Sequence, residues 1–315
     1  MTTKFVLGTA NFGLSYGIAN NRMLSEREAF AILEKAVDAG VRSVDTAQNY
    51  GEAEKVLGRF FRSHGKLLDV VTKLPDAEYV SSGDVKRQIK KSLDVLGIER
   101  IDMILLHSFA SFERCSAVLL PSLEAAVLDG LIGGYGLSVY HPEEAERANA
   151  TCRQAGFNIG AVQFPLNVFD QRFLKGGLLQ RLRASGVKLY ARSVFLQGLF
   201  FMNSASLKGH LKQTASKITE LAELAETRET SIETLALLFA LSSGVDYVVL
   251  GVDSAVQLEK NAALMHSDSM HLMAGLKDRF ETLQVADENI ILPYNWGNDI
   301  GKARSGTTND KSPMD

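Results

Sequence analysis

The sequence predicts a (β/α)8 barrel, an α/β fold in which eight parallel strands alternate with helices. Eight short runs of aliphatic and β-branched residues have the composition of buried strands, and longer stretches with helical spacing separate them. Parallel strands need long crossover connections, which these helical stretches would supply. The predicted strands are Phe5–Ala10, Val41–Thr46, Leu68–Leu74, Ile101–His107, Ile132–Val139, Ile159–Phe164, Val187–Val194 and Tyr247–Val252.

Helices are expected over residues 26–39, 83–96, 120–129, 141–155 and 231–243. Most helical stretches end at a glycine just before the next apolar run, and glycine stops helices because it tolerates the left-handed conformation. These glycines are Gly40, Gly97, Gly130, Gly156 and Gly186. The rival fold, a doubly wound open sheet, requires a G-x-G-x-x-G turn after its first strand. The sequence there is GTANFGLSYG, which does not fit, so the barrel is favoured.

Length and composition limit the remaining choices. A barrel of this kind occupies about 250 residues or more as one domain, so we expect one domain over residues 1–296 of the 315. Residues 297–315 are polar and rich in small side chains, and we expect them to form a disordered tail. The net charge is −3, from 34 basic and 37 acidic side chains. Such a balance argues against nucleic acid and against a membrane surface as partners.

The cysteine count and the apolar pattern point to the cytoplasm. Cys115 and Cys152 are too few for a disulfide framework or a four-thiolate metal site. The first residues lack the apolar core of a signal peptide, and no run of 18 apolar residues occurs. We therefore expect a soluble cytoplasmic protein.

Reactive side chains stand where three neighbouring strands end. Asp45 ends the second strand, with Tyr50 five residues later; Lys73 ends the third and His107 the fourth. Active sites of such barrels form at the carboxyl ends of the strands. Each residue alone has an ordinary structural explanation, such as a turn aspartate or a core histidine. Together they predict one site where an acid, a phenol, an ammonium and an imidazole converge.

These groups suit proton transfer to a carbonyl oxygen. A phenol has a pKa of about 10, and a nearby ammonium would lower it, while the carboxylate keeps the lysine charged. The imidazole would orient the substrate oxygen by hydrogen bonding. None of the four supplies a hydride, so the site needs a cofactor, and no metal is expected.

The order and spacing of several motifs resemble the aldo-keto reductase family. GTANFG, DTAQNYG, VTK, LLHS, GLSVY, AVQFPLN, ARSVFLQGLF and VLGVDSAVQLEKN carry this resemblance over residues 4–265. It implies an enzyme that reduces a carbonyl to an alcohol with NAD(H) or NADP(H). Tyr50 would donate the proton, Lys73 and Asp45 would tune the pKa of Tyr50, and His107 would orient the carbonyl.

The resemblance also implies a set of cofactor contacts. Ser138, Gln163 and Asp45 correspond to positions around the nicotinamide, and small residues after strand seven to the pyrophosphate loop. Strand eight would lead to the adenosine end. The implied cofactor-binding residues are Gly8, Thr9, Asp45, Ser138, Gln163, Arg192, Ser193, Phe195, Gln197, Gly198, Leu199, Gly251, Val252, Asp253, Ser254, Gln257 and Asn261.

Three positions depart from the family pattern. Val139 replaces an asparagine that usually follows the serine of strand five. Arg192 replaces an aromatic residue; it could stack on the nicotinamide, reach an anionic substrate, or form an outward ion pair. Asp253 and Gln257 stand where basic residues often grip the 2′-phosphate of NADP, so NADH is a possible cofactor beside NADPH, the commoner one in the family, and Lys260 could compensate for Asp253.

The loops suggest the substrate and leave other functions open. Aromatic and polar residues would line a pocket for a small carbonyl compound, sugar-like or anionic, and the chain is expected to be a monomer or a weak homo-oligomer. The substrate residues are Asn11, Phe12, Tyr16, Phe109, Tyr140 and the long loop 200–214. The main alternative is a nucleotide-sensing regulatory subunit with little turnover. A Schiff-base enzyme at Lys73 and a metal-dependent hydrolase are weaker.

Overall fold

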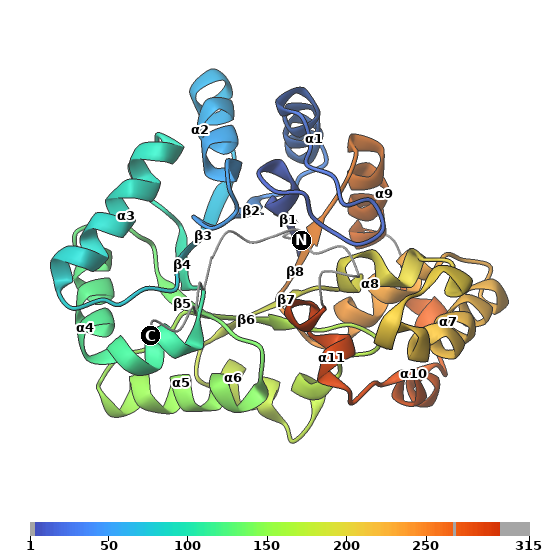
Figure 1. Ribbon diagram of the computed structural model, residues 1–315. Coiled ribbons are helices and arrows are strands. Elements are labelled where there is room, and N and C mark those ends of the chain that lie inside the picture. Colours follow the sequence, from blue (N-terminus) through green and yellow to red (C-terminus); the bar gives the residue numbers. More distant parts are fainter. Residues whose placement is uncertain (1–3, 267–268, 297–315) are drawn as a thin grey trace, which may run out of the picture.

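The computed structural model describes residues 4–266 and 269–296, and eight parallel strands form a closed barrel surrounded by helices (Figure 1). Each strand pairs with the next in the chain, and the last pairs with the first. The predicted fold class is confirmed. The strands are β1 Phe5–Gly8, β2 Ser43–Asp45, β3 Asp69–Leu74, β4 Met103–Leu106, β5 Tyr135–Ser138, β6 Ala161–Pro165, β7 Lys188–Arg192 and β8 Tyr247–Gly251.

The helices pack their apolar faces on the outside of this barrel. Side-chain caps start several of them: Ser25 and Ser81 each bond the backbone three residues on, while the glutamate or aspartate found there bonds back. The helices are α1 Glu26–Asp38, α2 Ala53–His64, α3 Ser82–Leu96, α4 Phe109–Leu128, α5 Pro142–Gln154, α6 Leu178–Ala184, α7 Ala215–Thr227, α8 Ile232–Ser242, α9 Ala255–His266, α10 Lys277–Leu283 and α11 Glu288–Ile291.

The strand period of two decides which side chains point into the barrel. An inner cluster contains Val71 of β3, Leu105 of β4 and Tyr190 of β7 among others. Residues two positions later lie on the same face of a strand. Lys73, His107 and Arg192 therefore follow these inner residues toward the barrel axis at the carboxyl ends of the strands.

Helix α4 is longer than the sequence predicted. We expected it from residue 120, but it begins at Phe109, with Ser108 as its cap, and continues through Pro121. Apolar residues at helical spacing, including Phe112, Cys115 and Leu119, are buried along the added turns. Their burial outweighs the local cost of the proline.

The segment 200–214 does delay the next helix, as expected. It consists of 3-10 turns, and α7 begins only at Ala215. The prediction that residues 1–296 form one domain stays a prediction, and the predicted tail 297–315 lies outside the described residues. No helix within the described ranges is long and apolar enough to cross a membrane.

Candidate active site

A buried ion pair lies at the centre of the predicted site. Lys73 Nζ donates to Asp45 Oδ1 at 2.6 Å and to the Thr46 carbonyl at 2.9 Å, and the lysine side chain is 1% exposed. Burying an ammonium alone is very unfavourable, so the carboxylate on the adjacent strand is what allows it here. The predicted pairing of Asp45, on β2, with Lys73, on β3, is therefore present.

Tyr50 lies above this pair and faces His107. The Lys73 ammonium is 5.0 Å from the Tyr50 ring centroid, and the rings of Tyr50 and His107 meet edge to face at 5.8 Å. The structure thus brings together all four side chains that the sequence predicted.

Two motif glycines set the position of Tyr50. A Cβ on Gly13 would lie 1.9 Å from the Tyr50 carbonyl oxygen, and one on Gly51 would lie 2.2 Å from the Gly13 carbonyl oxygen. Gly51 also has φ +56°. The loop after β1 and the loop after β2 can therefore touch only with glycine at both places. Residue-by-residue reasoning about reactive side chains missed both glycines, although the motifs GTANFG and DTAQNYG contain them.

The predicted lowering of the Tyr50 pKa is wrong. Burial, and then the Asp45 carboxylate, raise the pKa of Tyr50 above its usual range, and the charge of Arg192 opposes this only in part. Burial also lowers the pKa of Lys73 against the opposing effect of Asp45. A phenol with a raised pKa stays protonated at neutral pH, so it is a proton donor rather than a base.

The imidazole of His107 is held neutral. Burial, followed by the charges of Lys73 and Arg192, lowers the pKa of His107 to about 3. A neutral ring keeps one N–H donor and one acceptor nitrogen. It can therefore donate a hydrogen bond to a substrate oxygen across the whole physiological pH range.

This depressed pKa predicts a pH-dependent stability. Between pH 7 and 5 the unfolded chain protonates His107, whose unfolded pKa is about 6.5, while the folded chain does not, so the free energy of unfolding falls with pH. The contribution is at most about 2 kcal/mol over that range. In urea denaturation at pH 7 and pH 5, we expect the free energy of unfolding of His107→Gln to lack this part of the pH dependence. His64→Gln, on α2, is the control; equal pH dependence of His107→Gln and wild type would contradict the assignment.

One of the residues predicted to contact the nicotinamide is hydrogen-bonded to the Asp45–Lys73 ion pair. Gln163 Nε2 donates to Asp45 Oδ2 at 2.7 Å, and Ser138 Oγ donates to Gln163 Oε1 at 3.5 Å. Thr9 Oγ1 donates to the Asp45 carbonyl at 2.9 Å. Neighbouring Gly8 pairs with Asp45 in the sheet. These residues from four strands form one polar patch, and their contact with a nicotinamide stays a prediction.

The loop after β7 has an unusual backbone. Ser193, Leu196 and Gln197 all have positive φ, of 61°, 46° and 53°, and Gly198 has 91°. Non-glycine residues rarely adopt this conformation, and strained backbone of this kind clusters at ligand sites. Asn167 supports the loop, since its Nδ2 donates to the Ser193 carbonyl at 3.1 Å. Phe195 is half-buried and Leu199 buried, so the loop is anchored by apolar contacts.

A buried amide without a partner marks the predicted adenosine end. Neither Nδ2 nor Oδ1 of Asn261, on α9, has a hydrogen-bond partner among the described residues, although the side chain is fully buried. Leaving such groups unpaired costs about 1–3 kcal/mol, which is typical of a site that awaits a ligand. Nearby, Gln257 accepts from the Asp253 N–H at 2.8 Å, and the hydroxyl of Ser254 accepts from the Gln257 N–H at 3.2 Å.

The charged side chains at this end already have partners within the protein, neutral ones for Asp253 and a charged one for Lys260. Asp253 accepts hydrogen bonds from Asn20 at 2.7 Å and from Asn11 at 3.3 Å. Lys260, the one residue considered as a compensation for Asp253, pairs with Glu233 at 2.8 Å. Glu233 is a residue that the sequence reasoning missed, since it precedes Lys260 by 27 positions and lies on α8.

Arg192 points into the barrel mouth and contacts the loop after β5. Its guanidinium carbon lies 4.3 Å from the Tyr140 ring centroid, and its Nη2 donates to the Val139 carbonyl at 3.1 Å. The described residues offer it no salt bridge, so the alternative of an outward ion pair is not what this structure shows. Tyr140 in turn meets Tyr294 edge to face at 4.8 Å.

Comparison with known proteins agrees with this geometry. The family model described as "Aldo/keto reductase family" matches residues 4–272. The chain belongs to the aldo/keto reductase family. It is 28% identical to D-threo-aldose 1-dehydrogenase of a Pseudomonas species over 81% of this chain and 89% of the relative. It is 27% identical to L-glyceraldehyde 3-phosphate reductase of Escherichia coli strain K12, over 78% of this chain and 80% of the relative.

A solved structure has the same fold. An aldo-keto reductase from Bacillus halodurans, in its holo form, superimposes with a TM-score of 0.72 at 19% identity, covering 90% of this chain and 93% of that one. This likeness concerns the aldo/keto reductase barrel alone.

Several predicted substrate residues of this aldo/keto reductase lie elsewhere. Phe12 is 2% exposed inside the main core, and Phe200, the first residue of the predicted loop 200–214, is buried against Phe169, so both rings pack in the core of this structure. Asn11 uses its amide on the Val252 carbonyl at 2.8 Å and on Asp253, which ties two loops together. The two rings pack with the apolar core. The sequence alone does not show which aromatic residues of a loop point into the core.

Other predicted substrate residues do border the site. Tyr16 is 38% exposed, bonds Gln197 through its side chain, and is close enough to Tyr50 for the two phenols to interact electrostatically. Phe109 is half-buried, its ring is covered by the Arg147 guanidinium at 5.1 Å, and its contact with substrate stays a prediction. Tyr294, near the end of the described chain, was missed as a rim residue of this aldo/keto reductase.

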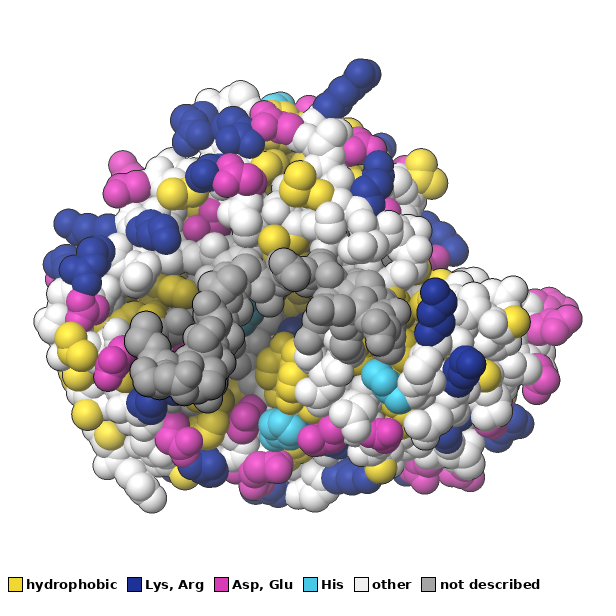
Figure 2. All heavy atoms as spheres, viewed as in Figure 1, with side chains coloured by type: hydrophobic (Ala, Val, Ile, Leu, Met, Phe, Trp, Pro, Cys, Tyr) yellow, Lys and Arg dark blue, Asp and Glu magenta, His cyan; other side chains and the backbone are white. Residues whose placement is uncertain are grey.

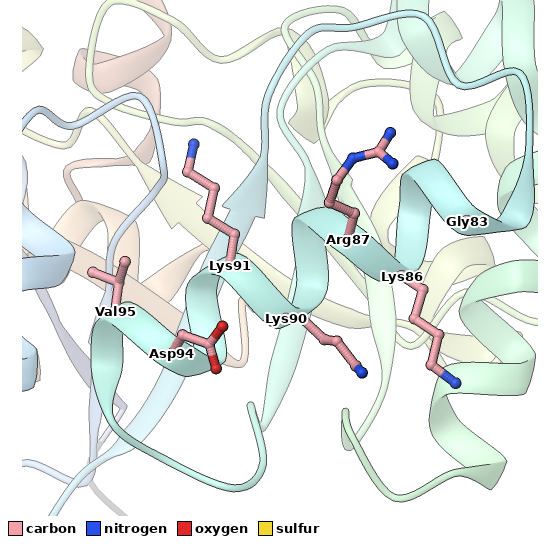
Figure 3. Close-up of a pocket in the computed structure, with 7 residues that line it drawn as sticks. All are labelled: Gly83, Lys86, Arg87, Lys90, Lys91, Asp94 and Val95. Atoms are coloured by element: carbon pink, nitrogen blue, oxygen red, sulfur yellow. The ribbon is translucent and has the colours of Figure 1, made fainter.

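The outer face of α3, away from the candidate active site, carries several charged side chains. Figure 3 shows its lysines and arginine spread along the helix, pointing in different directions rather than toward one point. Lys86 pairs with Asp129 at 3.0 Å, and Arg87 pairs with Asp84. This face is therefore a solvated helix surface. No cluster of three or more His, Cys, Asp or Glu side chains able to hold a metal ion occurs within the described parts of the chain.

Proposed function

We propose that this protein reduces a carbonyl group to an alcohol with a nicotinamide coenzyme. The observation that carries the proposal is the convergence of Asp45, Tyr50, Lys73 and His107 at one end of the barrel. A protonated phenol, a neutral imidazole and a buried ion pair at one rim fit the protonation of an oxygen that gains negative charge.

Each of the four side chains has a distinct role in this proposal. Tyr50 donates its hydroxyl proton to the carbonyl oxygen. His107, being neutral, donates a hydrogen bond that orients the same oxygen. Lys73 lies beside the Tyr50 ring, where its charge stabilises the phenolate left after proton transfer, and Asp45 holds the ammonium in place.

The predicted coenzyme-binding residues fit a dinucleotide. When bound, the nicotinamide would supply the hydride. Ser138 and Gln163 would hold its carboxamide, and the left-handed backbone after β7 resembles the backbone concavities that bind phosphate. The unpaired amide of Asn261 offers both a donor and an acceptor to an adenine.

The relatives suggest sugar-type carbonyl compounds as substrates. Two of them are named for an aldose and for glyceraldehyde 3-phosphate. On the face of the molecule that Figure 2 shows, acidic and basic side chains are interspersed. Such a mixed surface suits a small substrate better than a polyanion. Screening aldoses, keto acids and aldehydes for coenzyme oxidation tests the function. Binding of coenzyme without turnover of any carbonyl compound would favour the regulatory subunit instead.

We expect NADH to be preferred over NADPH by at least about tenfold. By the family resemblance, Asp253 corresponds to a position that grips the 2′-phosphate of NADP, and its carboxylate would repel that phosphate. Glu233 neutralises Lys260, and Arg22 pairs with Glu28 at 2.8 Å. A phosphate would therefore meet no unmatched cation among these residues. The ratio of kcat/KM for the two coenzymes measures this preference.

Glu233→Gln should reduce the preference for NADH over NADPH several-fold, because it frees the Lys260 ammonium to bind the 2′-phosphate. Glu259→Gln is a matched control, since it removes one negative charge from α9 but affects only the weak pair with Lys35 at 3.9 Å. Wild-type preference for NADPH, or equal shifts in both variants, would count against this account of the adenosine end.

A further inference from the structure

We infer that Arg192 binds an anionic group on the substrate, a carboxylate or a phosphate carried by the carbonyl compound. This inference rests on the proposed function and narrows its substrate class. Its basis is a half-buried guanidinium at the rim of the site, fixed by neutral partners and matched by no carboxylate in the described chain.

The strand register sends this side chain to the reacting centre. Tyr190 belongs to the inner cluster of the barrel, and Arg192 follows it by two residues at the carboxyl end of β7. Lys73 and His107 lie at the same carboxyl end of the barrel, so the guanidinium shares the barrel mouth with them, and its charge contributes to the pKa shifts of Tyr50, Lys73 and His107. A group bound to Arg192 is therefore close to the proposed proton donor.

Neutral contacts hold the guanidinium in one orientation. Its face stacks on Tyr140, Nη2 donates to the Val139 carbonyl at 3.1 Å, and Nη1 donates weakly to Ser193 Oγ at 3.4 Å. Tyr294 packs against the Tyr140 ring from the chain's C-terminal segment. Arginine has five N–H donors, and these two bonds leave others for a planar or tetrahedral oxyanion.

The charge count at the rim favours an anion. Asp45 already neutralises Lys73 at 2.6 Å, so Arg192 is the excess positive charge among the described groups that interact with Tyr50. Two further phenols, Tyr16 and Tyr140, interact electrostatically with Arg192 and Tyr50, and each can donate a hydrogen bond. A half-buried cation surrounded by neutral donors is a site for a carboxylate or phosphate oxygen.

The contacts favour substrate rather than coenzyme as the ligand. The proposed pyrophosphate loop, residues 193–199, and the unpaired Asn261 lie on the β7 and β8 side of the mouth. The Arg192 side chain contacts this loop only through the weak bond from Nη1 to Ser193 Oγ at 3.4 Å, while Nη2 and the guanidinium face contact Val139 and Tyr140 after β5. The loop after β5 follows Ser138 at the carboxyl end of that strand, the same end of the barrel as Lys73 and His107, and the NADH titration described below distinguishes the two ligands.

Matched substrates test the inference in the full-length protein. We would compare glyceraldehyde with glyceraldehyde 3-phosphate, and butyraldehyde with succinic semialdehyde, in wild type, Arg192→Gln and Arg192→Lys. The ratio of kcat/KM for the anionic over the neutral member should fall about 10- to 100-fold in Arg192→Gln, as expected for a lost charge-assisted hydrogen bond. Arg192→Lys should restore part of it. An unchanged ratio in both pairs would overturn the inference.

Two further measurements separate the possible failures. The dissociation constant of NADH, from fluorescence titration, should change much less than the substrate ratio in Arg192→Gln; a selective loss of NADH affinity would assign Arg192 to the coenzyme. Malonate binding by calorimetry needs no turnover and should be lost in Arg192→Gln. If wild type reduces no carbonyl compound, the proposed function fails, while the malonate result still supports or overturns the anion site.

Discussion

Replacing Tyr50 with phenylalanine should reduce kcat for carbonyl reduction by about 10²- to 10⁴-fold, the usual contribution of a positioned proton donor. The ring's contacts with Lys73 at 5.0 Å and with His107 at 5.8 Å need no hydroxyl, so the folded structure should persist. Thermal unfolding and NADH affinity should therefore change little. Steady-state kinetics on any substrate found by screening measures the loss.

A hydroxyl removed from the other end of the barrel is the control for Tyr50→Phe. Tyr135 begins β5 and donates its hydroxyl to Glu124 at 2.9 Å. Tyr135→Phe should lower stability modestly and leave kcat near wild type. Undiminished turnover in Tyr50→Phe would defeat the catalytic assignment. Because burial and Asp45 raise the pKa of Tyr50, the wild-type rate should also show no loss of the proton donor up to pH 9.

The fold and the reactive residues of the site could be predicted because both depend on local pattern. Eight strand-like runs alternating with helical stretches leave few topologies, and parallel strands align their carboxyl ends. Asp45, Lys73 and His107 each lie at or next to the carboxyl end of a strand, so their convergence follows from the barrel itself. Loop residues lack such a rule: Phe12 turned into the core while Tyr16, four residues later, reached the rim.

Pairings between distant segments could not be predicted from the chain. Lys260 finds Glu233 on another helix, and Asn20 reaches Asp253 across 233 positions. Such pairs depend on how loops pack on the finished barrel. The direction of the Tyr50 pKa failed for a related reason. The sequence showed a cation nearby, but not that burial and the Asp45 carboxylate would outweigh it.

The buried pair of Asp45 and Lys73 should dominate the stability of the site. Asp45→Asn leaves the ammonium buried without a carboxylate, and Lys73→Met leaves the carboxylate with only the Gln163 amide. Each single change should lower the free energy of unfolding by about 3–5 kcal/mol, whereas the double variant should recover a large part of it. Urea denaturation at pH 7 of all four proteins gives the coupling energy.

An exposed ion pair provides the comparison for this cycle. Lys86 and Asp129 are 3.0 Å apart with side chains 54% and 51% exposed, and the same double-mutant cycle there should give no more than about 1 kcal/mol. Burial lowers the pKa of Lys73, so in Asp45→Asn the lysine can become neutral as pH rises. The loss of stability in that variant should then shrink between pH 7 and 9. Purely additive losses at the buried pair would mean that the two side chains do not depend on each other, and Asp45 would no longer explain why Lys73 is held beside Tyr50.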